Sequence, residues 1–334
     1  MAVPTNTRLR YGAVGVREDL SNIIYNISPT DTPFMSGAGQ GSCDNTLFEW
    51  QKESLAAAAA NQKIEGDDPG SLAVVEPTRL SNYTQISYKT VQSSGTAEAV
   101  NFAGRKSTQA YQLAKRAKEI KRDMELMLTG EDLKSDGASP SPGPAAARKT
   151  GAFMSWLGES PAATSNIIDG SASPVAPIAN AGTGSSKATP SGSDAVLTMA
   201  MVNECVEQIY KAGGSADTIM CDAPLKVKMS SLAGSTVADL VKNWDKDAPA
   251  HAVNAVDVIV TDFGTFRIVP SRFCLANQLY FIDFDFWSID YLRPFQTETL
   301  AKTGDSVKQM MIAEYGLRGK NGQSSGAVIG VKDA

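Results

Sequence analysis

The side chains with the greatest potential for chemistry are sparse in this sequence of 334 residues. His251 is the single histidine, so any Ser-His-Asp or Cys-His arrangement would depend on that one residue. No G-x-S-x-G motif stands elsewhere in the chain to supply an activated serine. A catalytic His251 is one interpretation, and a histidine in a surface loop is the interpretation that we favour.

Two further motifs suggest a bound ligand at first sight. The glycine-rich run from Gly37 to Gly41 lacks the G-K-[ST] of a phosphate-binding loop, and it opens a strand instead of a helix. Asp283 and Asp285 share one face of a predicted strand, but no third metal ligand lies in register with them. The aromatic residues around them alternate with acids, which favours core packing over stacking on nucleic-acid bases. We therefore predict no enzyme activity, no cofactor and no metal site.

Composition narrows the class of protein further. The formal net charge is -5, whereas a protein whose main task is gripping nucleic acid is usually basic. The four cysteines, Cys43, Cys205, Cys221 and Cys274, form no C-x-x-C pair and are expected to be reduced thiols. No segment reaches the roughly 18 apolar residues that span a bilayer, and the N-terminus has no apolar signal region. We expect a protein that is folded and used where it is made, without a membrane.

Residues 1–45 are predicted to form an extended arm. Glycines and the X-Pro steps at Pro29 and Pro33 keep this segment out of regular helix. Apolar side chains on an arm without a core need another surface to cover them. They either strap the arm to its own domain or lie on a neighbouring subunit, and we favour the neighbour. The residues concerned are Ile23, Ile24, Tyr25, Ile27 and Phe34.

Two alternating segments predict a long antiparallel hairpin. In residues 46–54, Phe48 and Trp50 fall on one face, and in residues 83–91, Ile86 and Tyr88 do the same. An acidic, glycine-containing tip lies between these two legs. A hairpin with so wide a tip is poorly stable alone in water. We expect these four apolar residues to dock the hairpin onto a neighbouring subunit.

Residues 101–129 give the clearest local prediction, a long helix. Apolar residues recur at three- and four-residue spacing, and Gly130 is placed to end the helix. A basic face lies opposite the apolar stripe. It is either a solvated surface or a face turned toward phosphates or toward an acidic patch of another subunit. The residues of this face are Lys115, Arg116, Lys121 and Arg122.

The rest of the chain predicts an α+β fold. Residues 131–195 are rich in Ser, Ala, Gly and Pro and read as long surface loops. After residue 196, helices and strands mix without the regular βαβ order of a doubly wound sheet. We expect a helix capped by Asp194, then short strands, then two long C-terminal strands joined by a turn at 319–326.

Several of these segments resemble the head proteins of tailed bacteriophages, the major capsid proteins with the Hong Kong 97-type fold. The resemblance rests on YGAVGVREDLSNIIYNISPTDTPFMS at 11–36, TLFEWQKESLAAAAAN at 46–61, VDVIVTDFGTFRIVPSRF at 256–273 and FWSIDYLRPFQTETLAKTGDS at 286–306. It implies an N-terminal arm (1–45), an extended loop (46–100), a spine helix (101–129) within a peripheral domain (101–195 and 293–334), and an axial domain (196–292).

The resemblance also implies a function and partners. The chain would self-assemble as hexamers and pentamers into an icosahedral shell around double-stranded DNA, which it would contact without sequence specificity. Portal, scaffolding and decoration proteins would be further partners. The shell would assemble in the cytoplasm of a bacterial host and become part of the virion. A nanocompartment of the same fold that holds cargo enzymes, as encapsulins do, is the alternative.

Overall fold

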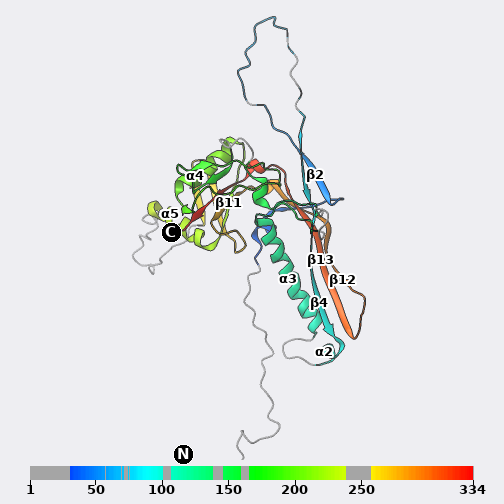
Figure 1. Cartoon of the computed structure of the whole chain (residues 1–334). Helices are drawn as coiled ribbons and strands as arrows, with labels where there is room; N and C mark the ends of the chain where they lie inside the picture. Colours follow the sequence, from blue (N-terminus) through cyan, green and yellow to red (C-terminus); the bar gives the residue numbers. More distant parts are fainter. Residues whose placement is uncertain are drawn as a thin grey trace, which may run out of the picture.

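The structure is a computed structural model that describes residues 31–56, 58–68, 70, 74, 76–100, 107–137, 146–158, 165–237 and 257–333. It has the predicted mixed α+β architecture, with a long blade on one side and a more compact part on the other (Figure 1). A hairpin projects from the region where the two parts meet. No helix among the described residues is long and apolar enough to cross a membrane.

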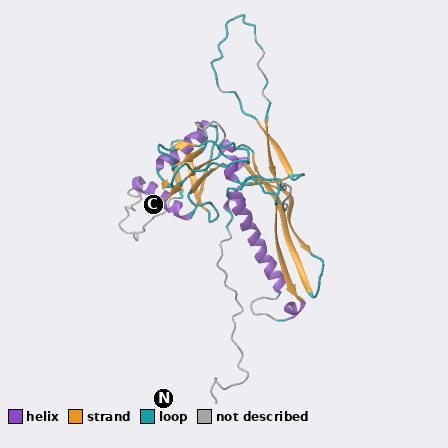
Figure 2. Cartoon of the chain, viewed as in Figure 1, coloured by secondary structure: helices purple, strands orange, loops and turns teal. Residues whose placement is uncertain are grey.

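The blade is a four-stranded sheet with one helix, α3, laid along it (Figure 2). Lys89 of β4 pairs with Asp123 of α3 at 2.5 Å, so residues of β4 that share the face of Lys89 point toward the helix. Strand β1 is parallel to β12, and the other neighbours are antiparallel. In order across the sheet, the strands are β1 (Gly39–Ser42), β12 (Trp287–Thr299), β13 (Ser306–Gly319) and β4 (Gln85–Ser94).

Helix α3 (Thr108–Thr129) begins at a defined N-cap. The Ser107 hydroxyl accepts a hydrogen bond from the Ala110 N–H, and residues 101–106 of the predicted helix lie outside the described residues. Ile120, Met124 and Leu128 recur every four residues and are fully buried. The helix ends at Gly130 as expected, but with φ -76°, so the predicted left-handed cap is not used. The short helix α2 (Gly95–Ala99) precedes it.

The compact part is built on a seven-stranded sheet whose two faces are both covered. Ile219 and Phe281 face a core with α4 (Met199–Lys211) and α5 (Ala223–Val237). Met220 and Tyr280 face a second core that also contains side chains of α3 and of the 3-10 helix η2 (Phe153–Trp156). The strands in order are β6 (Ala176–Pro177), β5 (Ile167–Asp169), β14 (Gly326–Ile329), β11 (Gln278–Ile282), β8 (Thr218–Cys221), β10 (Gly264–Pro270) and β9 (Val258–Thr261).

The C-terminal strands differ from the prediction. Strand β13 pairs with β12 and β4 in the blade, whereas β14 joins the compact sheet between β11 and β5, so the two do not form a hairpin. The short 3-10 helix η5 (Gly322–Ser324) lies between them, and β15 (Val331–Lys332) pairs with β7 (Ala195–Val196). The burial of β14 explains this difference. All four of its residues are buried, and a strand that is apolar on both faces is stable inside a sheet that is covered on both sides.

Two local predictions need correction. The second leg of the hairpin is β3 (Thr78–Tyr83), which pairs with β2 (Leu47–Lys52), while residues 85–94 form β4 of the blade. The chain thus leaves the hairpin at Thr84, near the start of the predicted leg at residues 83–91. Asp194 does not cap α4 but accepts a hydrogen bond from Asn277 Nδ2 at 2.7 Å, and Thr198 takes the N-cap position.

Candidate functional site

Groups suited to catalysis do not gather in one place among the described residues. His251 lies outside them. Within them, no three His, Cys, Asp or Glu side chains come together as a potential metal site. Asp283 instead caps the 3-10 helix η4 (Phe284–Phe286), with its carboxylate accepting from the Asp285 N–H at 3.2 Å. Asp283 therefore has a structural role as a helix cap.

The four cysteines are free thiols and are buried. Burial raises the pKa of the Cys43 thiol to about 11 and that of Cys221 to about 12. It also raises the pKa of Cys205 and Cys274. Because the thiolate is the nucleophile and the metal ligand, these are inert side chains.

The arm is anchored to its own chain where the structure describes it. Ile23, Ile24, Tyr25 and Ile27 lie outside the described residues. Phe34, in helix α1 (Pro33–Gly37), is 0% exposed and packs edge-on against Phe153, with ring centroids 5.8 Å apart. The expectation that Phe34 contacts a neighbour is therefore corrected, because no surface of this ring remains for another copy.

A buried carboxylate completes the anchor of α1. Glu125 of α3 accepts hydrogen bonds from the backbone N–H groups of Phe34 at 2.7 Å and Met35 at 2.9 Å. The first turn of α1 offers these N–H groups no partner within the helix, and the side chain of Thr32 does not cap them. Burial raises the pKa of Glu125, although the two N–H donors act in the opposite direction. The carboxylate thereby ties the end of the arm to the spine of the molecule.

The base of the hairpin is also held by its own chain. Phe48 is buried and stacks on Trp50 with ring centroids 5.8 Å apart. Trp50 in turn lies 5.2 Å from Trp156 of η2, and the guanidinium of Arg318 lies over both hairpin rings. The expected contact of Phe48 with a neighbour is thus corrected, and the partly buried Trp50 packs mainly inside the subunit. We call Phe48, Trp50, Trp156 and Arg318 the hairpin socket.

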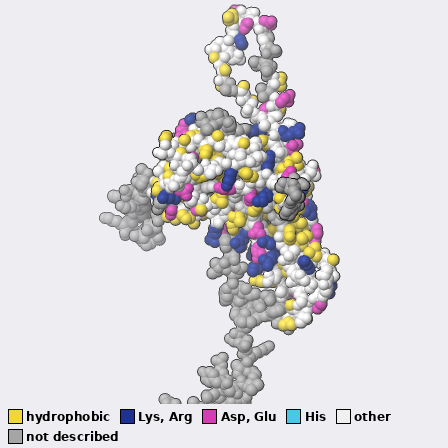
Figure 3. Space-filling model, in the orientation of Figure 1, with side chains coloured by type: hydrophobic (Ala, Val, Ile, Leu, Met, Phe, Trp, Pro, Cys, Tyr) yellow, Lys and Arg dark blue, Asp and Glu magenta, His cyan; other side chains and the backbone are white. Residues whose placement is uncertain are grey.

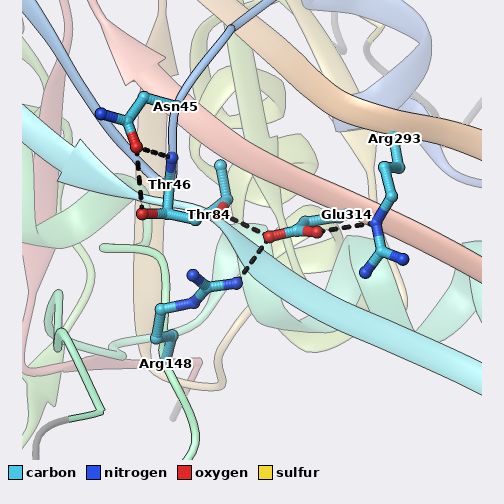
Figure 4. A network of polar contacts seen from close by, with 6 residues as sticks. All are labelled: Asn45, Thr46, Thr84, Arg148, Arg293 and Glu314. Carbon is cyan, nitrogen blue, oxygen red and sulfur yellow. Dashed lines mark hydrogen bonds and ion pairs between the residues drawn. The ribbon is translucent and has the colours of Figure 1, made fainter.

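A polar network secures the same junction (Figure 4). Glu314 of β13 is buried and accepts from Thr84 Oγ1 at 2.9 Å, Arg148 at 2.6 Å and Arg293 at 2.9 Å. The two arginines come from distant parts of the chain, one from the 146–158 segment and one from β12. Because a buried carboxylate is costly unless charges compensate it, the two cations fix these segments around Thr84, where the hairpin meets the blade.

Ile86 and Tyr88 remain open to a partner. Their side chains are 43% and 61% exposed, and they lie on the face of β4 opposite Lys89, which points toward α3. In the neighbouring strand β13 they stand beside Glu314 and Ile312. We call this part of the blade surface, which exposes Ile86 and Tyr88, the bare face, and contact of these two residues with a neighbour stays a prediction.

The most exposed apolar side chains were missed by the sequence analysis. Leu55, Ile64 and Val74 are 97%, 83% and 87% exposed on the loop between β2 and β3, which stands clear of the body in Figure 3. Glu65, Asp67 and Asp68 lie at its tip. An alternating pattern could not reveal these positions, because the loop is not a strand. They are recognised only in the structure, where no other part of the described chain covers them.

The structure separates the four residues of the basic face. Lys115 and Lys121 are exposed, and the Lys121 ammonium lies 6.0 Å from the centroid of the Phe295 ring. Arg116 is paired with Glu119 at 2.5 Å, and Arg122 lies over the Phe273 ring. Only the two lysines thus present their charge freely to an outside partner.

A spine helix on a long sheet, a compact second part, an anchored arm and a projecting hairpin together define a shell subunit of the Hong Kong 97-type capsid fold (Figure 1). Solved capsids have the same fold. The capsid of cyanophage A-1(L) matches with a TM-score of 0.64 at 11% identity, covering 95% of this chain and 97% of that one. The capsid of a native GTA particle matches with a TM-score of 0.60 at 11% identity, covering 95% of each chain.

Sequence comparison narrows the class to a family. The SU10 major capsid protein family matches residues 3–332. A major capsid protein of Escherichia phage Phieco32 is 30% identical over 352 residues, covering 98% of each chain. The chain belongs to the SU10 major capsid protein family and is a major capsid protein of a tailed phage. The predicted family, fold and role are confirmed, and the nanocompartment alternative is not favoured.

Proposed function

We propose that copies of this protein form hexamers and pentamers of an icosahedral shell by placing the extended loop of each copy on a neighbour. The observation that carries the proposal is the exposure of Leu55, Ile64 and Val74, which no part of the described chain covers. Covering a side chain of this size is worth about 1.5–3 kcal/mol. Each contact is modest, but many such contacts act together in a closed lattice.

The bare face of the blade is a surface on which the loop of a neighbouring copy could pack, because it too exposes apolar side chains. Ile86 and Tyr88 are apolar and exposed there, so two uncovered apolar surfaces exist on one subunit. A repeating contact that joins two different surfaces of identical subunits forms rings when the rotation between copies closes, as a capsid requires. The anchored hairpin base supports this proposal, because a fixed base delivers the loop in a defined direction.

The shell is proposed to enclose double-stranded DNA, with Lys115 and Lys121 of α3 facing it. Their charges lie free on a subunit whose net charge is -5, so contact with DNA would be local and without base readout. Portal, scaffolding and decoration proteins are further proposed partners. Because the protein is a part of the virion, we also propose that it assembles in the cytoplasm of the host. No catalytic role is proposed for the chain.

The loop contact is tested by the triple variant Leu55→Ser, Ile64→Ser, Val74→Ser. Since all three side chains are exposed in the subunit, the free energy of unfolding should change by less than about 0.5 kcal/mol per site. Shell formation, scored by negative-stain microscopy, should be lost, because each inter-subunit contact loses roughly 5 kcal/mol of apolar burial. The control is Val227→Ser, which removes an exposed apolar side chain from α5. Normal shells from the triple variant would refute the role of the loop.

A further inference from the structure

Asp290 stands where the arm, the blade and the hairpin meet. In the blade, it lies beside Gly41 of β1 on one side and Gly316 of β13 on the other. Its side chain is 2% exposed, and it forms an ion pair with Arg318 and accepts a hydrogen bond from Ser288 Oγ at 2.9 Å. One carboxylate therefore lies against β1, the strand of the arm, and forms an ion pair with the arginine of the hairpin socket.

The Asp290 carboxylate lies so close to β1 that it leaves no room for a side chain at Gly41 without moving. A Cβ atom on Gly41 would lie within contact distance of an Asp290 carboxylate oxygen, so a methyl group there would push the carboxylate aside. The backbone of Gly41 is not left-handed, so closeness to Asp290 is what a side chain here would disturb. A shift of β1 that brings the backbone of Gly41 closer to Asp290 would thus displace the carboxylate.

The contact with the hairpin runs through Arg318. Its guanidinium carbon lies 5.6 Å from the ring centroid of Phe48 and 5.9 Å from that of Trp50. A planar guanidinium stacks on aromatic rings and pairs with a carboxylate at the same time, which a lysine cannot reproduce. Phe48 also lies directly over Gly316, where a Cβ atom would collide with the ring. The hairpin base therefore rests on the arginine and on the strand next to Asp290.

We propose that Asp290 and Arg318 form a positioning pair that links the placement of the arm strand β1 to the direction of the hairpin. The ion pair holds the guanidinium under the Phe48 and Trp50 rings, and β1 holds the carboxylate in place. A displacement at one of these two elements is passed to the other through three direct contacts. The inference rests on the proposed function, because the same pair would set the positions of both elements that extend from the subunit.

The direction of the hairpin is measured with spin labels at Gln51→Cys on β2 and Lys332→Cys at the end of the compact part. The native cysteines are buried and should not react. The wild-type chain should give one narrow distance distribution. Arg318→Met and Asp290→Asn should broaden or shift it, and Arg318→Lys, which keeps the charge but not the planar stack, should give an intermediate effect. Arg79→Met is the matched control, since Arg79 forms an exposed pair with Glu49 on the hairpin itself and should change nothing.

The coupling is tested by Gly41→Ala, which touches β1 but not the hairpin. This change should broaden the same distance distribution in the wild-type background and add nothing in the Arg318→Met background, because both act through one pair. An unchanged distribution in every variant, or effects of Gly41→Ala and Arg318→Met that simply add, would overturn the inference. If Arg318→Met does not fold, Asp290→Asn takes its place in the cycle.

The assembled state separates this inference from the proposed function. Asp290→Asn and Arg318→Lys should give shells with a wider spread of diameters than the wild type in electron micrographs. Wild-type shells together with variants of identical diameter and distance distribution would reject the pair and leave the capsid role intact. If the triple loop variant defined above assembles normally, the proposed loop contact is rejected. The distance measurements on free subunits would still decide whether β1 and the hairpin are coupled.

Discussion

At the scale of single residues, two buried carboxylates lie where the hairpin leaves the blade. Glu314 and Asp290 are both buried, and each is compensated by arginine. Such pairs are weak evidence of net stability, but removing one partner is strongly destabilising because it strands the other charge. Their value here is geometric, since they define how the 146–158 segment, β12 and β13 meet.

Replacing Glu314 with Ala should therefore lower the free energy of unfolding by about 3 kcal/mol. The estimate is at the low end of the range for a buried pair because Arg148 and Arg293 are 27% and 42% exposed and can be solvated in part. Urea unfolding of the free subunit measures it. Glu298→Ala, on the exposed end of β12, is the control and should change stability by less than about 0.5 kcal/mol. Equal effects of the two variants would contradict the network's role.

Sequence alone could not find these residues. Glu314 and Arg318 lie in a strand whose alternation marks faces but not partners, and Thr84, one partner of Glu314, is 230 residues away in the chain. The roles of Phe34 and Phe48 were misjudged for the same reason. An apolar residue in an arm or hairpin can be covered by its own body or by a neighbour, and only the tertiary arrangement distinguishes the two.

At the scale of elements, the prediction succeeded where one local pattern decides the outcome. The periodic apolar stripe of α3 and the Ser107 cap define that helix without help from the rest of the fold. The hairpin was harder, because the alternation at 83–91 belongs to β4 of the blade, and a single residue separates β4 from the true second leg, β3. Pairing is set by non-local contacts that a local pattern does not contain.

Helix α3 also carries the prediction for the basic face. Changing Lys115 and Lys121 together to Glu should leave shell formation intact and lower the amount of DNA packaged several-fold, because both free charges then repel phosphate. DNA content per particle is measured by absorbance and by gel analysis of purified heads. Lys302→Glu, on an exposed loop, is the control. Loss of shells instead of DNA would assign this face to an acidic patch on another subunit, and no change in either would show a merely solvated face.

At the scale of the whole molecule, the subunit combines a well-packed body with surfaces that it cannot cover itself. Two cores lie on either side of the seven-stranded sheet, whereas the loop and the bare face of the blade expose Leu55, Ile64 and Tyr88. Single exposed apolar residues are common, but a projecting loop held at a rigid base is an element built to reach another molecule. In the proposed function, these exposed surfaces are what joins one subunit to the next.

The most direct test is a reconstruction of the assembled shell by electron cryomicroscopy. The account predicts that residues 53–77 of each copy lie on an adjacent copy, with the side chains of Leu55, Ile64 and Val74 buried there. It also predicts that Phe34 and Phe48 stay inside their own subunit. A shell in which this loop folds back on its own body, or points into solvent without touching a neighbour, would contradict the account.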